Sequence, residues 1–289
     1  MEVTRKAYAK INLGLDVTGK RDDGYHLVRM IMQNIDIYDT LTFTDNETGD
    51  ITLRCSKEGI PTDGKNLICK VAQQLKDEYK VSRGVDICLE KVIPAAAGMA
   101  GGSTDGAAAY HALNELWGLG MSEEDMCRLG VKLGADIPYC IIGGTALSEG
   151  IGEVLTPLKE LADCAIVIAK PAIDVSTGWV YTELDNSTDV VHPDIDGIRA
   201  AIEAGDIKGM CKLIDNVLEP VTKTEHTVVG DIEKILLENG AIWAFMTGSG
   251  PTVFGIYEDV KKAGEGIEAV RKSGLAPDLF LTRPINPNL

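Results

Sequence analysis

A glycine-rich segment carries the clearest sign of chemistry in this chain. Residues 94–105 read Pro-Ala-Ala-Ala-Gly-Met-Ala-Gly-Gly-Ser-Thr-Asp and stand between an expected strand and an expected helix. Glycines let the backbone approach a ligand, and the first turn of a helix offers free N–H donors at a positive dipole end. Such a loop suits a polyphosphate. It has neither GxxxxGK[ST] nor GxGxxG spacing, and taken alone a tight connection is an equal alternative.

Three further segments place polar groups where they could act with this loop. Lys10 and Asn12 share a face of an expected strand, Asp136 stands at the mouth of another, and residues 246–254 read as two strands joined by a glycine turn. In isolation they read more simply as a solvated lysine, a turn or cap aspartate and a plain hairpin. One phosphoryl-transfer site would explain all four segments together, because a lysine and an aspartate can position a hydroxyl and balance charge.

The elements that must hold these groups alternate between strands and helices, so the sequence predicts an α+β chain. Period-2 alternation predicts a strand over 7–17, and Ser122 with Asp125 predicts a capping box at a helix start. The apolar pattern pauses at 156–163, which predicts domains over 1–158 and 159–289. Further strands are expected over 35–43, 51–55, 85–93, 136–147, 164–169, 241–246, 252–257 and 279–281, and helices over 66–79, 103–117, 195–204, 207–217, 228–238 and 260–272.

Composition limits the classes of partner. The 289 residues carry a formal charge of −16, which disfavours nucleic acid and anionic membranes as partners but leaves a phosphorylated small molecule possible. Seven cysteines stand singly without CxxC spacing, as in a reducing compartment, and no run of about 18 apolar residues occurs. Without a signal-peptide pattern, a cytoplasmic location is expected. The oligomeric state stays open.

Taken in order, K-x-N-L-x-L, P-x-x-x-G-x-x-G-G-S-T-D, G-A-D-x-P and T-G-S-G-P-T-V-F resemble the GHMP kinases. The resemblance implies a two-domain α+β fold, an N-terminal ATP-binding domain and an active site in the interdomain cleft. It also implies that ATP binds at the glycine loop, with an asparagine at the start of the preceding helix beside the adenosine. The ATP-binding residues would be Pro94, Ala95, Ala96, Ala97, Gly98, Met99, Ala100, Gly101, Gly102, Ser103, Thr104 and Asn66.

The N-terminal block, including Gly24-Tyr25-His26, is similar to the diphosphocytidyl-methylerythritol kinase family in particular. This likeness implies that Tyr25 stacks on a cytosine, that His26 binds its edge, and that Tyr181 closes the sandwich, with Trp179 as the weaker candidate. An aromatic plane beside a polar group suits a base with a π-face and a hydrogen-bonding edge. Without the family context, the triplet would also fit an ordinary hairpin turn.

The implied reaction is ATP-dependent phosphorylation of the 2-hydroxyl of a cytidine diphosphate-linked methylerythritol, in the non-mevalonate route to isoprenoid precursors. Asp136 would orient this hydroxyl, Lys10 would lie close to both reacting groups, and Asn12 would contact the substrate. Mg²⁺ would bridge the ATP phosphates, with Ser103 or Thr104 nearby. The alternatives are another GHMP enzyme, such as a mevalonate or homoserine kinase, and an inactive sensor, against which the intact lysine and aspartate argue.

The glycine loop departs from the usual family pattern, G-L-G-G-G-S-S-D-A, at four positions. Met99, Ala100, Thr104 and Gly106 replace leucine, glycine, serine and alanine. Ala100 is the important change, because a glycine with positive φ resists the addition of a Cβ.

Overall fold

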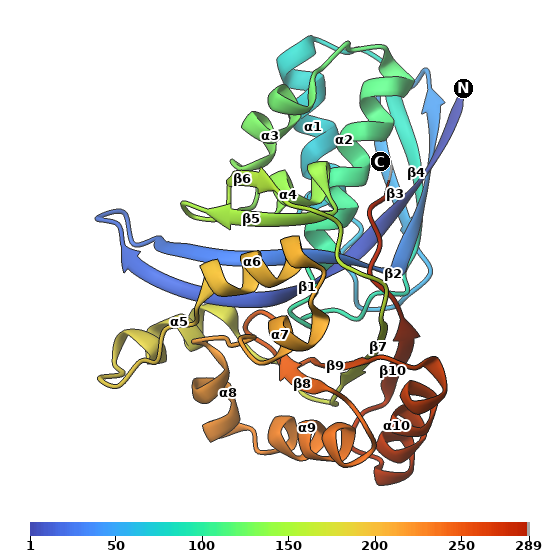
Figure 1. Ribbon diagram of the computed structural model, residues 1–289. Coiled ribbons are helices and arrows are strands. Elements are labelled where there is room, and N and C mark those ends of the chain that lie inside the picture. The colour runs from blue at the N-terminus through green and yellow to red at the C-terminus, as the bar shows by residue number, and fades with distance from the viewer. Residues whose placement is uncertain (288–289) are drawn as a thin grey trace.

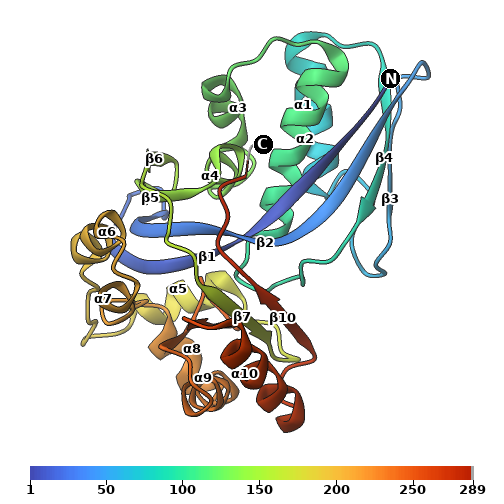
Figure 2. The ribbon, with the colours of Figure 1, turned by 45° about the vertical axis from the view of Figure 1, so that its right-hand side comes forward.

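The computed structural model describes residues 1–287 and is built around one long two-stranded ribbon. β1 (Glu2–Lys20) and β2 (His26–Asn46) pair antiparallel from Glu2↔Thr44 to Lys20↔His26. Figure 2 shows this ribbon as a curved band that crosses the molecule. Both halves of the chain pack against it, so residues on β1 can contribute to a site between them.

The first half completes a six-stranded sheet on this ribbon, counted over the described residues. The ends of β2 pair with different strands, which gives the order β3-β4-β2-β5-β6 with β1 on the other edge of β2. Helices cover one face of the sheet (Figure 1). The elements are β3 (Ile51–Cys55), β4 (Gly84–Glu90), β5 (Thr145–Glu149), β6 (Val154–Pro157), α1 (Leu67–Tyr79), α2 (Gly101–Trp117), α3 (Glu123–Gly130) and α4 (Ile137–Ile142).

The second half contains a four-stranded antiparallel sheet of order β10-β7-β9-β8, again over the described residues. α9 and α10 pack on this sheet, α5 to α7 lie nearer the ribbon, and α8 contacts α5 and α9 (Figure 1). The elements are β7 (Ala165–Lys170), β8 (Trp243–Met246), β9 (Val253–Tyr257), β10 (Asp278–Thr282), α5 (Thr177–Asp185), α6 (Ile195–Ala204), α7 (Ile207–Cys211), α8 (Glu219–Glu225), α9 (Val228–Glu238) and α10 (Val260–Ser273).

A β-bulge in the pairing of β1 with β2 lies between Tyr8 and Lys10, where the side chains of β1 pass from one core cluster to the other. The sequence predicts one continuous apolar face for this strand. Instead, Ala7 joins the core cluster that contains residues of α1 and α2, whereas Ile11 joins the cluster that contains residues of β7, β9 and α6. Tyr8 pairs with Tyr38 but Lys10 pairs with Asn34, so the additional residues of the bulge lie in β2. Lys10 and Asn12 still share a face, as predicted, with their side chains hydrogen-bonded at 2.7 Å.

The strand predicted over 136–147 is wrong in its first part. Residues 137–142 form the short helix α4, and only the end of the segment belongs to β5. Pro138 suits the first turn of a helix, where its missing N–H has no partner to lose, and Gly143, at φ 70°, ends the helix. A short buried apolar run does not distinguish helix from strand by periodicity.

Other differences concern length and short elements. The helix predicted over 207–217 ends at Cys211, after which the backbone of Asp215 turns to accept the N–H of Leu15 on β1. The capping box of Ser122 and Asp125 is present at the start of α3, as predicted. The sequence did not predict α5, α8 and β6.

The chain passes from the first sheet to the second between β6 and β7. We propose domains over 1–158 and 159–289 on this basis. The chain returns to the first sheet near its end, where Pro284 bridges Ile35 and the N–H of Ile285 donates to Asn34. This return ties the last part of the second half to the central ribbon.

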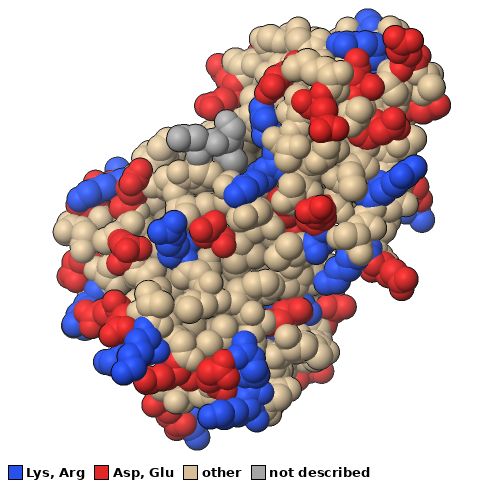
Figure 3. All heavy atoms as spheres, turned by 90° about the vertical axis from the view of Figure 1, so that its right-hand side faces the viewer, with Lys and Arg blue, Asp and Glu red and all other residues tan. Residues whose placement is uncertain are grey.

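Charged side chains of both signs are interspersed over the face shown in Figure 3. Within residues 1–287, no helix combines the length and apolar character that a membrane span requires.

Candidate active site

A cavity of about 890 Å³ joins most of the residues that the sequence singles out. It opens between the glycine loop, the β1–β2 ribbon, the N-terminal end of α4 and helix α5. Elements far apart in the sequence therefore meet at one place. The predicted residues that line the cavity are Lys10, Asn12, Tyr25, His26, Asn66, Pro94, Ala95, Ala96, Ala97, Gly98, Ala100, Gly101, Gly102, Ser103, Asp136 and Tyr181.

Lys10 is buried on β1 and points its ammonium at the glycine loop. Its Nζ donates to Asn12 Oδ1 and to the carbonyl of Gly98, both at 2.7 Å. Burial lowers the pKa of Lys10, while the negative charge of Asp136 opposes this fall. The ammonium thus holds the loop backbone and lies in the field of the aspartate.

The glycine loop leads directly into α2, whose first helical residue is Gly101. The residue before it, Ala100, adopts a left-handed conformation with φ 57° and ψ 26°. The loop therefore keeps the backbone turn that glycine favours, although the side chain there is a methyl group. The free N–H groups at the start of the 17-residue helix give this end of the cavity a positive partial charge, which suits phosphate.

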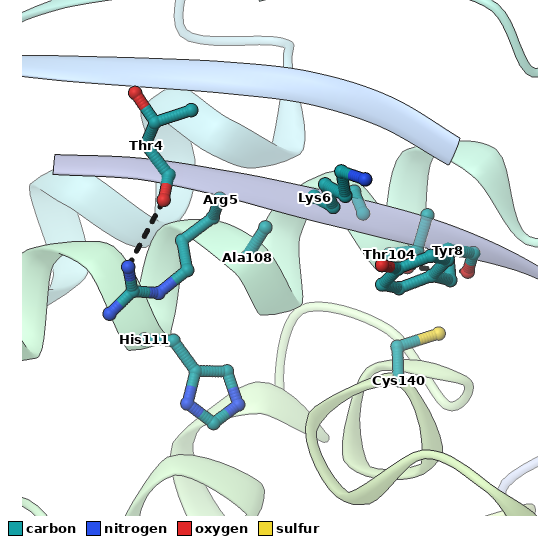
Figure 4. Close-up of a pocket in the computed structure, with 9 residues that line it drawn as sticks. Thr4, Arg5, Lys6, Tyr8, Thr104, Ala108, His111 and Cys140 are labelled. Atoms are coloured by element: carbon teal, nitrogen blue, oxygen red, sulfur yellow. Dashed lines mark hydrogen bonds between the residues drawn. The ribbon is translucent and has the colours of Figure 1, made fainter. Parts of the chain in front are cut away.

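Two residues of the predicted ATP loop do not line this cavity. Met99 is buried, and Thr104 donates its hydroxyl to the carbonyl of Tyr8 at 2.8 Å. Thr104 instead borders a second hollow of about 390 Å³ beside β1, with His111 and Cys140 (Figure 4). Of the two hydroxyls expected near a metal ion, only that of Ser103 borders the main cavity.

Asp136 occupies the N-cap position of α4 but makes no capping hydrogen bond with its side chain. A carboxylate at a helix N-terminus is favoured by the dipole and here stays available to the cavity. Its negative charge raises the pKa of Lys10, which burial lowers. The same charge raises the pKa of Tyr181, which burial also raises. The arrangement can orient a hydroxyl beside an ammonium.

Aromatic and polar side chains form the opposite end of the cavity. Tyr25 lies in the β1–β2 turn and is 57% exposed. The rings of His26 and Tyr181 are 4.6 Å apart and tilted by 31°, and His26 Nε2 lies 2.7 Å from Asp185 Oδ1. Trp179 instead approaches His226, with ring centroids 6.3 Å apart, and does not border the cavity.

Asn66 combines a structural role with its place at the cavity. Its Oδ1 accepts the N–H of Ile68 at 2.9 Å and so caps α1, while its Nδ2 donates to the carbonyl of Pro61 at 2.7 Å. Asparagine is among the favoured residues at this position. Both groups of the amide are therefore engaged in the protein.

The sequence interpretation missed several residues that border the cavity. Asp185 follows Tyr181 by four residues on α5, so helical spacing could have placed it beside the aromatic site, had α5 been predicted. Lys91 and Asp105 stand on either side of the glycine loop and form an ion pair at 2.9 Å. Ser249 shares a hydrogen bond of 2.9 Å with Thr177 across the second half.

The protein oxygens fit a metal ion only in part. Within residues 1–287 no group of three His, Cys, Asp or Glu side chains is placed to hold one. Mg²⁺ is often held by one or two protein oxygens together with substrate phosphates. Asp136 and Ser103 supply such oxygens at this cavity.

Comparison with known families agrees with this geometry. The model of the GHMP kinases N terminal domain matches residues 66–144, and that of the GHMP kinases C terminal region matches residues 198–275. A 4-diphosphocytidyl-2-C-methyl-D-erythritol kinase of Lachnoclostridium phytofermentans is 48% identical over 281 residues, 97% of each chain. One of Clostridium perfringens is 45% identical over 283 residues, 98% of each chain.

Solved structures give the same result. A crystal structure of 4-(cytidine 5'-diphospho)-2C-methyl-D-erythritol kinase superposes with a TM-score of 0.83 at 27% identity, covering 99% of this chain and 100% of the other. A homoserine kinase from Cytophaga hutchinsonii, at 19% identity and a TM-score of 0.79, covers 99% of this chain and 95% of its own, and shares the fold. The chain belongs to the GHMP kinase family and, within it, to the family of the 4-diphosphocytidyl-2-C-methyl-D-erythritol kinases.

Proposed function

We propose that this chain transfers the γ-phosphoryl group of ATP to the 2-hydroxyl of 4-diphosphocytidyl-2-C-methyl-D-erythritol, giving the 2-phosphate and ADP in the non-mevalonate route to isoprenoid precursors. One observation carries the proposal. The phosphate loop, the pair Lys10 and Asp136, and the aromatic group of Tyr25, His26 and Tyr181 border one cavity. A substrate with a base at one end and a hydroxyl at the other would reach from the aromatic group to the pair Lys10 and Asp136. The names of the relatives agree with such a substrate.

The reaction needs positioning and charge balance more than covalent catalysis. Asp136 orients the 2-hydroxyl and takes its proton as the hydroxyl oxygen bonds to the γ-phosphorus and the bond to the β–γ bridging oxygen breaks. Lys10 lies in the field of Asp136 and balances negative charge on the transferring group. The Gly98 carbonyl and Asn12 Oδ1 fix the position of the ammonium.

The two substrates are held at opposite ends of the cavity. The N–H groups at the start of α2 bind the ATP phosphates, and Asn66 lies on the adenosine side. The hydroxyl of Ser103 would hold Mg²⁺ together with the ATP phosphates, and the ion would neutralise phosphate charge. Asp185 accepts from His26 and so fixes which ring nitrogen of the histidine meets the cytosine edge. We place this reaction in the cytoplasm, because the cysteines suit a reducing compartment.

The test is ADP release by the purified protein with ATP and Mg²⁺ and one acceptor at a time. ADP formation with the cytidine-linked methylerythritol, and not with mevalonate or homoserine, is expected. Asp136→Asn should lower the rate at least about 100-fold, with ADP binding retained. Turnover of mevalonate or homoserine would contradict the acceptor assignment, and silence with every acceptor would favour a nucleotide sensor.

A further inference from the structure

Three charged side chains are buried together beneath the glycine loop. Lys91 Nζ lies 2.9 Å from Asp105 Oδ2 and also contacts Asp39 Oδ2, and the three side chains are at most 5% exposed. Burial disfavours the charge of Lys91, yet the two carboxylates together raise its pKa above the ordinary value; burial raises the pKa of Asp105, and Lys91 opposes that rise. Such a group is costly to bury unless its geometry serves a purpose or is well satisfied.

The topology of this cluster gives it a purpose. Lys91 lies three residues before the loop begins at Pro94, and Asp105 lies in α2 just after the loop ends. Asp39 stands on β2, and its Oδ1 accepts the N–H groups of Val92 and Ile93 at 2.6 and 2.8 Å. The cluster therefore ties both ends of the glycine loop to the same residue of the central ribbon.

The ammonium passes close beneath the loop backbone. A Cβ at Gly101 would lie 3.1 Å from Lys91 Nζ and 3.0 Å from Ile93 Cγ2, tighter than ordinary contacts. The first residue of α2 thus rests directly on the Lys91 side chain. Movement of Lys91 would remove the support beneath the N–H groups that face the cavity.

One atom of the cluster is not satisfied within the described protein. Asp105 Oδ1 is buried and has no hydrogen-bond partner there, although its residue borders the cavity. Buried polar atoms without partners are rare and call for an explanation. The second oxygen contributes nothing to holding α2, so the link of Asp105 to Lys91 depends on the single contact of its Oδ2.

We propose that Asp39, Lys91 and Asp105 form a buried ionic clamp that positions the glycine loop for nucleotide binding. Lys91 and Asp105 are positioning residues in this scheme and take no part in the transfer itself. The clamp rests on the proposed use of ATP at this loop, but not on the identity of the acceptor. It acts through the backbone of Gly101, so its loss weakens binding of ATP and ADP and leaves the site of the cytidine-linked acceptor intact.

The informative variant is Asp105→Ala, because it breaks the link to α2 and leaves Lys91 and Asp39 as a balanced pair. The dissociation constant for ADP, measured by calorimetry, should rise on the order of tenfold, and KM for ATP should rise in parallel. KM for the acceptor and kcat should each change by no more than about threefold. Asp105→Asn retains an oxygen that can accept from Lys91 and should restore most of the ADP affinity.

Asp45→Ala is the matched control. Asp45 is also a carboxylate of low exposure with one cation partner, Arg83 at 2.8 Å, and one buried oxygen without a partner, but it lies away from the cavity. The Asp45→Ala substitution should lower the free energy of unfolding without changing the ADP dissociation constant. Lys91→Met is unsuitable as the main test, because it would leave two buried carboxylates without a cation and could prevent folding.

The outcomes separate the clamp from the proposed function. Equal ADP affinity in Asp105→Ala and the wild type would overturn the clamp alone, as would a fall in kcat with KM for ATP unchanged. An Asp45→Ala variant as impaired in ADP binding as Asp105→Ala would also overturn it, because general destabilisation would then explain both. Failure of the wild type to bind ADP would overturn the kinase proposal and the clamp together, whereas an unexpected acceptor would leave the clamp standing.

Discussion

At position 100 the chain has an alanine where the backbone is left-handed, at φ 57°. A left-handed L-residue costs about 1–2 kcal/mol, whereas glycine adopts this conformation without strain but loses about 0.5–1 kcal/mol through the freedom of the unfolded chain. Ala100→Gly should therefore raise the free energy of unfolding by roughly 0.5–1 kcal/mol. Urea denaturation measures this change.

Ala95→Gly provides the control, because Ala95 is exposed, belongs to the same loop and has no positive φ. There the entropic loss acts alone, so stability should fall by about 0.5 kcal/mol. A decrease of the same size in both variants would contradict the strain assigned to Ala100. The sequence identified this position through its missing glycine; only the backbone dihedral shows that the turn is kept.

Glu219 should make stability depend on pH. Its carboxylate accepts the N–H of Met246 at 2.9 Å and Lys223 Nζ at 3.0 Å, and Lys223 also contacts Glu233. Burial and the charge of Glu233 raise the pKa of Glu219 from 4.5 to about 7. The folded state therefore binds this proton more tightly than the unfolded state, so the stabilisation is complete below about pH 4.5 and is lost as pH rises through 7.

The neutral variant Glu219→Gln should remove this loss. Relative to it, the wild-type melting temperature should fall by a few degrees between pH 5 and pH 8. Thermal denaturation across that range measures the difference. Glu238→Gln is a surface control, and its curve of melting temperature against pH should run parallel to that of the wild type. Parallel curves for Glu219→Gln as well would show that this carboxyl titrates normally in the folded protein.

At the scale of elements, the glycine loop is fixed by its contact with the β8–β9 turn. Gly98 has φ 68°, and a Cβ there would lie 2.4 Å from the carbonyl oxygen of Thr247. Gly98→Ala should therefore lower the free energy of unfolding by at least about 2 kcal/mol, because backbone must move on both sides. Gly102→Ala meets nothing closer than Leu67 Cδ1 at 3.8 Å and should be tolerated or slightly stabilising in its helix.

Chemical denaturation of Gly98→Ala and Gly102→Ala shows whether the contact with Thr247, or the loss of any glycine from the loop, lowers the free energy of unfolding. Similar losses in both would mean that the approach of the loop to Thr247 does not limit stability. The comparison also separates two uses of glycine in one motif. Gly98 is required by the close approach of the Thr247 carbonyl, whereas Gly102 has room for a methyl group.

The sequence predicted elements well where one periodicity persisted. α1, α9 and α10 lie within about two residues of their predicted ranges, because each carries a long apolar stripe. The segment 136–147 failed because a short run of five buried residues fits a helix or a strand equally. α5 escaped prediction because its only two buried residues, Val180 and Leu184, form too short a stripe.

Across the whole molecule, the sequence predicted the cavity residues through ordered motifs but not the contacts that hold them. Lys10 and Asn12 are two residues apart, so their shared face followed from alternation alone. Lys91 and Asp39 are separated by 52 positions and meet only through the pairing of β2 with β4. Interactions of this kind depend on topology, and neither composition nor local spacing contains them.

Both halves of the molecule contribute residues to one cavity, and this arrangement gives the last prediction. The phosphate loop comes from the first half, whereas Tyr181 comes from α5 in the second. Removing the ring in Tyr181→Ala should raise KM for the cytidine-linked acceptor about 10- to 100-fold, as expected for a lost stacking partner of a base. KM for ATP should stay within about twofold.

Tyr181→Phe keeps the ring and should retain most of the affinity for the acceptor. Trp179→Ala alters the same helix without touching the cavity, and a rise in acceptor KM equal to that of Tyr181→Ala would show that α5 matters through its packing rather than through the tyrosine ring.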